Sequence, residues 1–171
     1  MAELKSGYTT GACAAAGVKA AILYLHGQSI DRAELQALDG TPLFIPIKQI
    51  VRDNDTIWAE IIKYSGDDPD ITNGSAVWTG FRLLPEQKDI VFRAGEGIGT
   101  VTKAGLSVPV GQPAINPGPR QLIKKVIQEL LGSNIGCEIT ISIPNGAALA
   151  AKTLNPLLGV EGGLSVIGTT G

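Results

Sequence analysis

Three carboxylates lie within four residues of one loop, GDDPDITNG. Asp67, Asp68 and Asp70 repel one another, so water, a cation, hydroxyl groups or backbone donors must compensate their charge. Such a loop suits the hydroxyl groups of a ribose, or a cation, although a solvated acidic loop without a ligand is the simpler alternative. Pro69 and Gly74 restrict this loop beside the predicted strands, which favours a binding role.

A second segment with chemical potential is RAGEGIGTVTKAGLSVPVGQPAINPGPR, residues 93–120, which combines six glycines with four prolines. Glycine allows a ligand to approach the backbone closely, while proline fixes the backbone and removes an N–H donor. The apolar residues between them require burial, so we expect a long ordered loop that is set against a core and lines a site. A scaffold of tight turns that binds nothing is the alternative.

Gly95, Gly97 and Gly99 follow a predicted strand, as the glycines of a Rossmann-type nucleotide site do. That motif requires a helix immediately afterwards. Here residues 100–102 are β-prone instead. The glycines and prolines that follow, among them Pro109, prevent a helix. These glycines are therefore predicted to form a backbone cradle and not the first turn of a Rossmann fold.

Thr9 and Thr10 stand before an alanine-rich stretch of high helix propensity, ACAAAGVKAAILYL. The first turn of such a helix offers unpaired N–H groups and a partial positive charge, which suit an anion or a carboxylate. A tightly packed structural helix is an equal alternative. Cys13 lies in this turn, but no histidine is near it in the sequence, so we interpret it as a buried structural thiol.

The composition excludes several classes of protein. A chain of 171 residues with 44% hydrophobic content is enough for one core and one domain. The net charge is −2 and no basic run occurs, so nucleic acid is not expected as a partner. No apolar stretch spans a bilayer and no signal pattern opens the sequence, so we expect no membrane partner and a cytoplasmic location. The single His26 and the distant Cys13 and Cys137 predict no protein-bound metal.

The segments that carry chemistry need a scaffold, and the hydrophobic periodicity predicts one of the α+β class. The expected strands are 34–38, 43–47, 49–52, 56–64, 75–84, 89–93, 137–143 and 162–167, and the expected helices are 12–25, 119–131 and a short one that ends near residue 153. The strands 75–84 and 89–93 are expected to pair with each other. The result is a hairpin-rich mixed sheet packed against a few helices, with the Gly/Pro-rich segment as a long ordered loop.

Several long blocks of the sequence closely resemble members of the CbiD family. They are GYTTGACAAAGVKAA at 7–21, GDDPDITNG at 66–74, GEGIGTVTKAGLSVPVGQPAINPGPR at 95–120, and ISIPNG with KTLNPLLGVEGGLSVIGTTG at 141–171. The resemblance implies a cobalt-precorrin-5B C1-methyltransferase of the oxygen-independent cobalamin pathway, with S-adenosyl-L-methionine as methyl donor and a cobalt-precorrin macrocycle as substrate. Family members continue past the last block, so residues 1–171 are expected to form a single N-terminal domain that folds but is catalytically incomplete.

The resemblance does not specify which residues act, so we assign roles by chemistry and leave the catalytic residues unknown. The acidic arms of the macrocycle need donors, for which the candidates are Thr9, Thr10, Gly11, Lys103, Asn116 and Arg120. The methyl donor carries a ribose and a sulfonium, for which the candidates are Asp67, Asp68, Asp70, Gly95, Glu96, Gly97, Gly99 and Thr100. A homo-oligomer is a further expectation. The alternatives are a non-catalytic tetrapyrrole- or nucleotide-binding module, and an enzyme that uses Cys13 as nucleophile.

Overall fold

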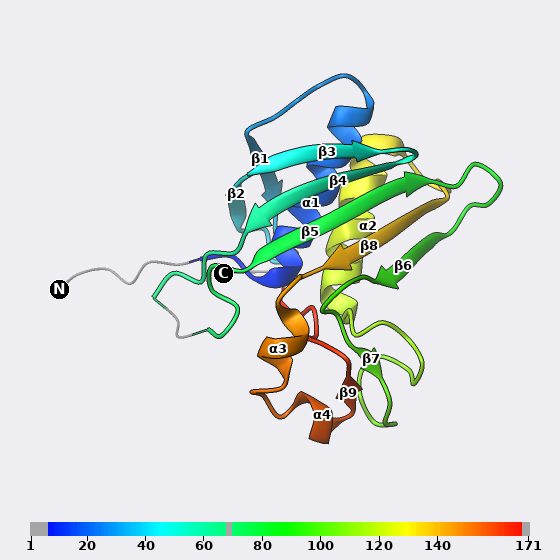
Figure 1. Ribbon diagram of the computed structural model, residues 1–171. Helices are drawn as coiled ribbons and strands as arrows, with labels where there is room; N and C mark the ends of the chain where they lie inside the picture. The colour runs from blue at the N-terminus through cyan, green and yellow to red at the C-terminus, as the bar shows by residue number, and fades with distance from the viewer. Residues whose placement is uncertain (1–6, 68–69, 169–171) are drawn as a thin grey trace.

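A computed structural model describes residues 7–67 and 70–168 of the chain (Figure 1). Its centre is a five-stranded sheet with the strand order β3-β4-β5-β8-β6. These strands cover Gln49–Asp53 (β3), Thr56–Ile62 (β4), Ala76–Leu83 (β5), Cys137–Ser142 (β8) and Ile90–Ala94 (β6). β6 runs parallel to β8, whereas the other neighbouring pairs are antiparallel. The predicted α+β class with a mixed sheet is therefore confirmed.

Two helices, α1 (Thr10–Leu25) and α2 (Pro117–Leu131), lie behind the sheet in the view of Figure 1. α1 contacts β4 and β5, and it also contacts α2 and the hairpin formed by β1 (Arg32–Gln36) and β2 (Pro42–Pro46). Most of α1 is buried for this reason. Within the described residues, no helix is long and apolar enough to cross a membrane.

The ends of both helices follow local sequence rules. The hydroxyl group of Thr9 accepts a hydrogen bond from the Ala12 amide at 3.1 Å, and Gly27 adopts a φ of +83° just after the helix ends. α2 begins two residues earlier than the predicted Pro119. Pro117 occupies the start instead, because a proline there lacks an N–H group that would have no helical partner anyway.

The expectation that the strands 75–84 and 89–93 pair with each other is wrong. Both strands form, as β5 and β6, but β8 lies between them and pairs with each. The connection after β5 reaches across the start of β8, where the Leu84 amide donates to Gly136 and the Cys137 amide donates to Asp89. The physical reason is that a position between β5 and β6 pairs the backbone of β8 on both edges while its alternate side chains remain buried.

A smaller part of the chain lies at the end of the sheet where β6 and β8 end (Figure 1). It contains β7 (Thr100–Val101), α3 (Gly146–Ala150), α4 (Asn155–Leu158) and β9 (Val160–Glu161). The predicted strand 162–167 is wrong, since the strand in this region is β9, which ends at Glu161, and the residues after it make only isolated bridges. Leu164 bridges Ile98 and Val166 bridges Ile115, so this backbone runs between two arms of the glycine-rich segment and has no single partner strand.

Gly17 brings α1 into direct contact with β5. A Cβ atom at this position would lie 2.7 Å from Thr79 Oγ1 and 2.9 Å from Thr79 Cβ, and Thr79 is fully buried in the sheet. Because Thr79 is fully buried, its side chain has no free space to move into. The separation between α1 and the sheet is therefore set by the absence of a side chain here.

We predict that Gly17→Ala destabilises the protein by about 1–3 kcal/mol through overpacking. Helix propensity alone would predict the opposite sign, since Ala is favoured over Gly inside a helix by roughly 1 kcal/mol. Thermal unfolding followed by circular dichroism measures the effect, and the expected fall in Tm is about 2–4 °C per kcal/mol for a domain of this size. A raised Tm would show that α1 and β5 can separate without cost.

Candidate functional site

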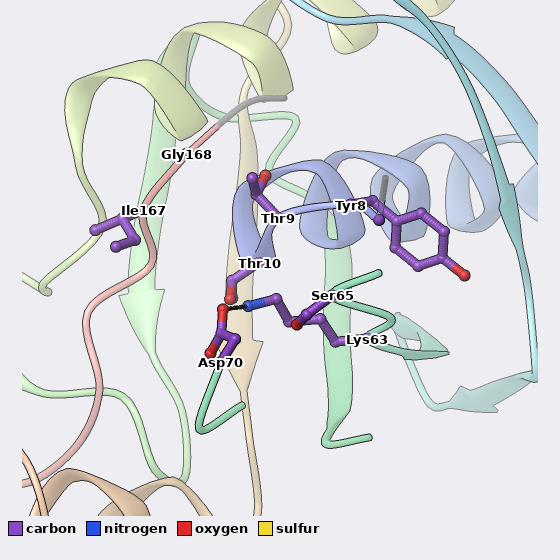
Figure 2. A pocket seen from close by; sticks show the side chains of 9 residues that line it. Tyr8, Thr9, Thr10, Lys63, Ser65, Asp70, Ile167 and Gly168 are labelled. Atoms are coloured by element: carbon purple, nitrogen blue, oxygen red, sulfur yellow. Dashed lines mark hydrogen bonds and ion pairs between the residues drawn. The ribbon is translucent and has the colours of Figure 1, made fainter. Parts of the chain in front are cut away.

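A cavity of about 170 Å³ opens at the N-terminal end of α1 (Figure 2). Three parts of the chain that are distant in sequence form it: the start of α1, the end of β4 with the acidic loop, and the segment after β9. The lining residues are Gly7, Tyr8, Thr9, Thr10, Lys63, Ser65, Asp70, Ile167 and Gly168. The cavity therefore brings together two sets of candidate binding residues that lie far apart in the sequence, the threonines at the start of α1 and the acidic loop.

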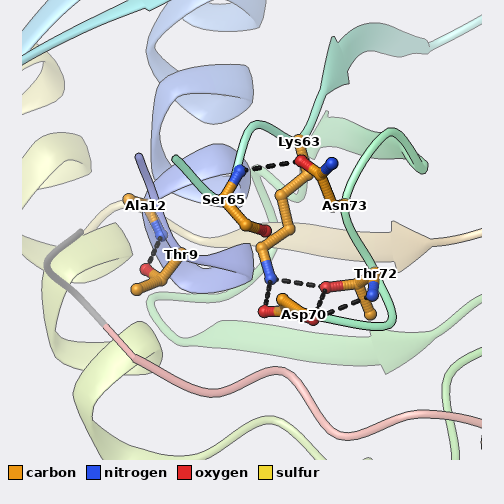
Figure 3. A network of polar contacts seen from close by, with 7 residues as sticks. All are labelled: Thr9, Ala12, Lys63, Ser65, Asp70, Thr72 and Asn73. Atoms are coloured by element: carbon orange, nitrogen blue, oxygen red, sulfur yellow. Dashed lines mark hydrogen bonds and ion pairs between the residues drawn. The ribbon is translucent and has the colours of Figure 1, made fainter. Parts of the chain in front are cut away.

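Lys63 organises the polar contacts of this site. Its side chain is only 6% exposed, and its Nζ donates to Asp70 Oδ2 at 2.6 Å and to Thr72 Oγ1 (Figure 3). Asp70 Oδ1 in turn accepts from the Thr72 amide at 2.8 Å and from the Thr72 hydroxyl at 2.6 Å. A buried ammonium group requires such a set of partners, so Lys63 and Thr72 are the cation and the hydroxyl that hold this part of the acidic loop.

The pKa of Asp70 follows from these contacts. Partial burial raises it, but hydrogen bonds from Lys63 and Thr72, together with the charge of Lys63, outweigh burial and lower the pKa to about 2. Asp70 is therefore ionised at neutral pH. Of the other two carboxylates of the loop, Asp67 lies in an exposed turn, and Asp68 lies outside the described residues.

Two further groups at the cavity carry unused hydrogen-bonding capacity. Ser65 is 9% exposed, and its buried Oγ has no hydrogen-bond partner in the described part of the chain. In the first turn of α1, the amides of Gly11, Ala12 and Cys13 donate to Ile167 and to Thr9, whereas none of the described groups accepts from the Thr10 amide. The cavity is thus lined by a residue with a buried, unpaired hydroxyl and by the first residue of α1, whose amide has no acceptor among the described groups.

The glycines after β6 pack closely, but against the chain itself. A Cβ at Gly97 would overlap the carbonyl oxygen of Ile143 and lie 2.9 Å from the Gly146 amide nitrogen. Gly95 is crowded by the Ser142 side chain and the Ile141 carbonyl, and Gly99 by the Val160 side chain and the carbonyls of Glu161 and Gly163. The close approach that we expected of a ligand is therefore made by neighbouring backbone and side chains of the chain itself at these positions. Glu96 and Thr100 are exposed at the surface, and cofactor binding by residues 95–100 stays a prediction.

Arg120 lies away from the cavity and holds the proline-rich end of the same segment. Its Nε donates to Ile115 at 2.7 Å, a terminal nitrogen donates to Pro113 at 3.1 Å, and the guanidinium lies 5.0 Å from the centre of the Phe92 ring. Burial lowers the pKa of the guanidinium. Two of its five donors are engaged in this structural role, which the sequence did not predict.

Two other candidates for substrate binding also lie outside the α1 cavity. Lys103 is exposed, and its Nζ donates to the Leu157 carbonyl at 2.8 Å. Asn116 precedes α2, where its side chain makes no capping hydrogen bond, and it lines a separate cavity of about 150 Å³ beside α4. The structure therefore brings Thr9, Thr10 and Asp70 together but leaves Lys103, Asn116 and Arg120 elsewhere.

The hypothesis of a cysteine nucleophile is wrong for Cys13. The side chain is fully buried, and burial raises the pKa of its thiol to about 12, against a smaller lowering by the charge of Lys63. A nucleophilic cysteine needs an accessible thiolate at neutral pH. Burial likewise raises the pKa of Cys137 to about 11. Among the described residues, no group of three or more His, Cys, Asp and Glu side chains is placed to hold a metal ion.

Sequence reasoning missed Lys63 and Ser65, although a signal for Lys63 was present. Ile57, Ala59 and Ile61 alternate towards the core, and Lys63 continues that series by two residues. The same alternation therefore predicts a buried lysine next to an acidic loop. Ser65 continues the same alternation by two further residues, so its burial follows the same signal.

Gly97 and Gly111 provide a matched test of the packing role. Both adopt positive φ, +77° and +88°, so an Ala costs roughly 1–2 kcal/mol at either position. Only Gly97 is also crowded by backbone, since nothing lies within 4 Å of a Cβ at Gly111. We predict that Gly97→Ala lowers the Tm clearly more than Gly111→Ala does. Equal shifts in the two variants, measured by calorimetry, would contradict the packing role.

The stability contributed by Asp70 should depend on pH with a defined sign. The pKa of Asp70 is lower in the folded protein than the ordinary value of 3.8, so its contribution is complete above that value and disappears as the pH falls towards about 2. We predict that Asp70→Asn is less stable than the unmodified protein at pH 6, and that the difference shrinks between pH 4 and 2. Urea unfolding at several pH values measures this.

Asp55→Asn is the control for this experiment, because Asp55 is exposed in the β3–β4 turn and forms no ion pair with the described residues. A constant difference between Asp70→Asn and the unmodified protein from pH 6 to pH 2 would show that the Lys63–Asp70 pair does not stabilise the fold.

Comparison with known proteins places the chain in a family. The CbiD family model matches residues 1–171. A cobalt-precorrin-5B C(1)-methyltransferase from Methanocaldococcus jannaschii is 49% identical over 168 residues, which cover 98% of this chain and 46% of the relative. The protein of the same name from Syntrophotalea carbinolica is 47% identical over 172 residues, covering 100% of this chain and 48% of the relative.

A solved structure agrees with these matches. The crystal structure of cobalamin biosynthesis protein CbiD from Archaeoglobus fulgidus superimposes with a TM-score of 0.71 at 28% identity, covering 98% of this chain and 54% of that one. The chain spans about half the length of the curated relatives it matches. Because the family model covers every residue and the solved structure shares the fold, the chain belongs to the CbiD family.

Proposed function

We propose that the protein, at the full length of its relatives, transfers a methyl group from S-adenosyl-L-methionine to C1 of cobalt-precorrin-5B and yields cobalt-precorrin-6A. The observation that carries this proposal is the identity of almost half of all residues, over nearly the whole chain, with relatives named cobalt-precorrin-5B C(1)-methyltransferase. Their name implies a methyl donor, and a sulfonium donor suits transfer to carbon. We also propose that residues 1–171 form one domain of this longer architecture.

Methyl transfer from a sulfonium is an in-line displacement, in which the positive charge on sulfur disappears as the new carbon–carbon bond forms. The protein has to align the methyl group with C1 and exclude water, and such positioning can lower a barrier by roughly 7–11 kcal/mol. The cobalt ion belongs to the substrate. The chain therefore needs donors for the acidic arms of the macrocycle and a shaped site for the methyl donor, and it does not need a metal of its own for this step.

The described residues support a division of these tasks. For the macrocycle we propose Lys103, Arg120 and Asn116, which lie in or beside the glycine-rich segment, with Thr9, Thr10 and Gly11 at the start of α1. Arg120 retains three N–H donors beyond the two that hold Ile115 and Pro113. For the methyl donor we propose the acidic loop with Asp67, Asp68 and Asp70, and the segment Gly95, Glu96, Gly97, Gly99 and Thr100.

A methyl-transfer assay tests the proposal. Cobalt-precorrin-5B is incubated with S-adenosyl-L-methionine labelled in its methyl group, together with either the 171-residue chain or a polypeptide extended to the length of the relatives. We expect label at C1 of the macrocycle with the longer polypeptide and none with the 171-residue chain. Binding of the macrocycle without transfer by the longer polypeptide would favour a non-catalytic binding module. Equal turnover by both would show that the 171 residues suffice.

A further inference from the structure

The cavity at the start of α1 presents both signs of charge, with the Lys63 ammonium group paired to the Asp70 carboxylate at 2.6 Å. Asp70 is 36% exposed there, while the positive end of α1 and the buried ammonium group of Lys63 face the same space. A simple anion would meet the Asp70 carboxylate, and a simple cation would meet the helix end and Lys63. A small group that carries both charges avoids both conflicts.

The hydroxyl group of Ser65, a residue that lines this cavity, lacks a hydrogen-bond partner among the described groups. Its Oγ is buried and is not bonded to any described group, and a buried hydroxyl without a partner is uncommon in native proteins because it loses its hydrogen bonds to water. Ser65 lines the cavity beside Lys63 (Figure 2). Since the Oγ itself has almost no accessible surface, a turn of the Ser65 side chain about its Cα–Cβ bond would bring this hydroxyl to an acceptor atom of a ligand in the cavity.

The start of α1 supplies a second donor on the same side. Among the first four amides of the helix, those of Gly11, Ala12 and Cys13 are used within the chain. The Thr10 amide has no hydrogen-bond acceptor among the described groups, and Thr10 lines the cavity. A carboxylate is the acceptor that such a helix end favours, because the dipole adds to the hydrogen bond.

The size of the cavity limits what it can hold. Pockets for drug-sized ligands measure about 300–1,000 Å³. The cavity here has about 170 Å³, which accommodates one end of such a molecule and not a nucleoside together with its substituent. Its ligand is therefore a compact charged group, either free or at the end of a larger molecule.

We propose that this cavity binds an α-amino acid group, with its carboxylate accepting from Ser65 Oγ and the Thr10 amide and its ammonium group facing Asp70. Lys63 holds Asp70 in place through their ion pair. The identity of the ligand rests on the proposed function: there, the group is the methionyl end of S-adenosyl-L-methionine. Thr10 then serves the methyl donor and not the macrocycle, and this assignment replaces the role in macrocycle binding proposed for it above.

Calorimetric titration of the 171-residue chain tests the carboxylate side. The ligands are S-adenosyl-L-methionine, L-methionine and 5′-methylthioadenosine, which lacks the amino acid group. We expect Ser65→Ala to weaken the first two about fivefold to tenfold, the effect of one neutral hydrogen bond, and to leave 5′-methylthioadenosine unchanged. Without ligand the variant should be as stable as the unmodified chain or more stable, since an unsatisfied hydroxyl is removed.

Ser75→Ala is the matched control, because Ser75 is also buried but does not line the cavity. It should leave all three affinities unchanged. Unchanged affinities in Ser65→Ala, or an equal loss for 5′-methylthioadenosine, would overturn the proposal. So would the absence of any binding of L-methionine and S-adenosyl-L-methionine to the unmodified chain, since every proposed contact lies within it.

Asp70→Asn tests the ammonium side against 4-(methylthio)butanoate, which is L-methionine without its ammonium group. The unmodified chain should prefer L-methionine over this analogue about tenfold or more, and Asp70→Asn should remove most of that preference. Equal binding of both ligands to the unmodified chain would identify a plain carboxylate site, such as one for an acidic arm of the macrocycle, and would overturn the amino acid assignment.

The outcome is separable from that of the methyl-transfer assay. A cavity that rejects L-methionine would leave methyl transfer by the full-length polypeptide unaffected as a proposal. Conversely, binding of L-methionine that depends on Ser65 and Asp70 would establish the amino acid site even if no methyl group reached the macrocycle.

Discussion

The close packing of α1 against the sheet and α2 is the constraint on which the rest of the structure depends. A helix that is buried on most of its circumference has to carry small residues where its neighbours come closest. Gly17 allows contact with Thr79, and a Cβ at Gly11 would overlap the carbonyl oxygen of Gly168 and lie 2.8 Å from Pro119 Cγ. These contacts fix the first turn of α1 at one place, where it becomes one wall of a cavity.

Electrostatics complete that cavity. Lys63 follows the buried face of β4 and reaches the interior, so its charge needs a partner within the protein. Asp70 and Thr72 supply that partner, and their contacts tie the acidic loop to the end of β4. One ion pair thereby stabilises the loop and leaves a carboxylate edge facing the start of α1, which explains why the site contains both signs of charge.

The glycine-rich segment has a more structural role than its composition indicates. Gly97 lets two stretches of backbone approach each other, and Arg120 binds the carbonyl groups of Pro113 and Ile115 while its guanidinium lies over the ring of Phe92. Such contacts keep a loop ordered without regular secondary structure. They also connect the loop to β6 and to the start of α2, so a ligand at this surface would meet a preformed wall.

The sequence by itself determined the elements that depend on near neighbours, namely α1 with its Thr9 cap and the alternating strand β8, and its long motif blocks identified the family. The alternation of β4 also contained the signal for a buried Lys63, which sequence reasoning missed. Only the tertiary structure decided that β8 separates β5 from β6, and that Asp70 and Ser65 meet Thr10 in one cavity. The reason is that local propensity acts over a few residues, whereas the partner of a buried charge or strand edge is chosen by which distant segments can be packed together.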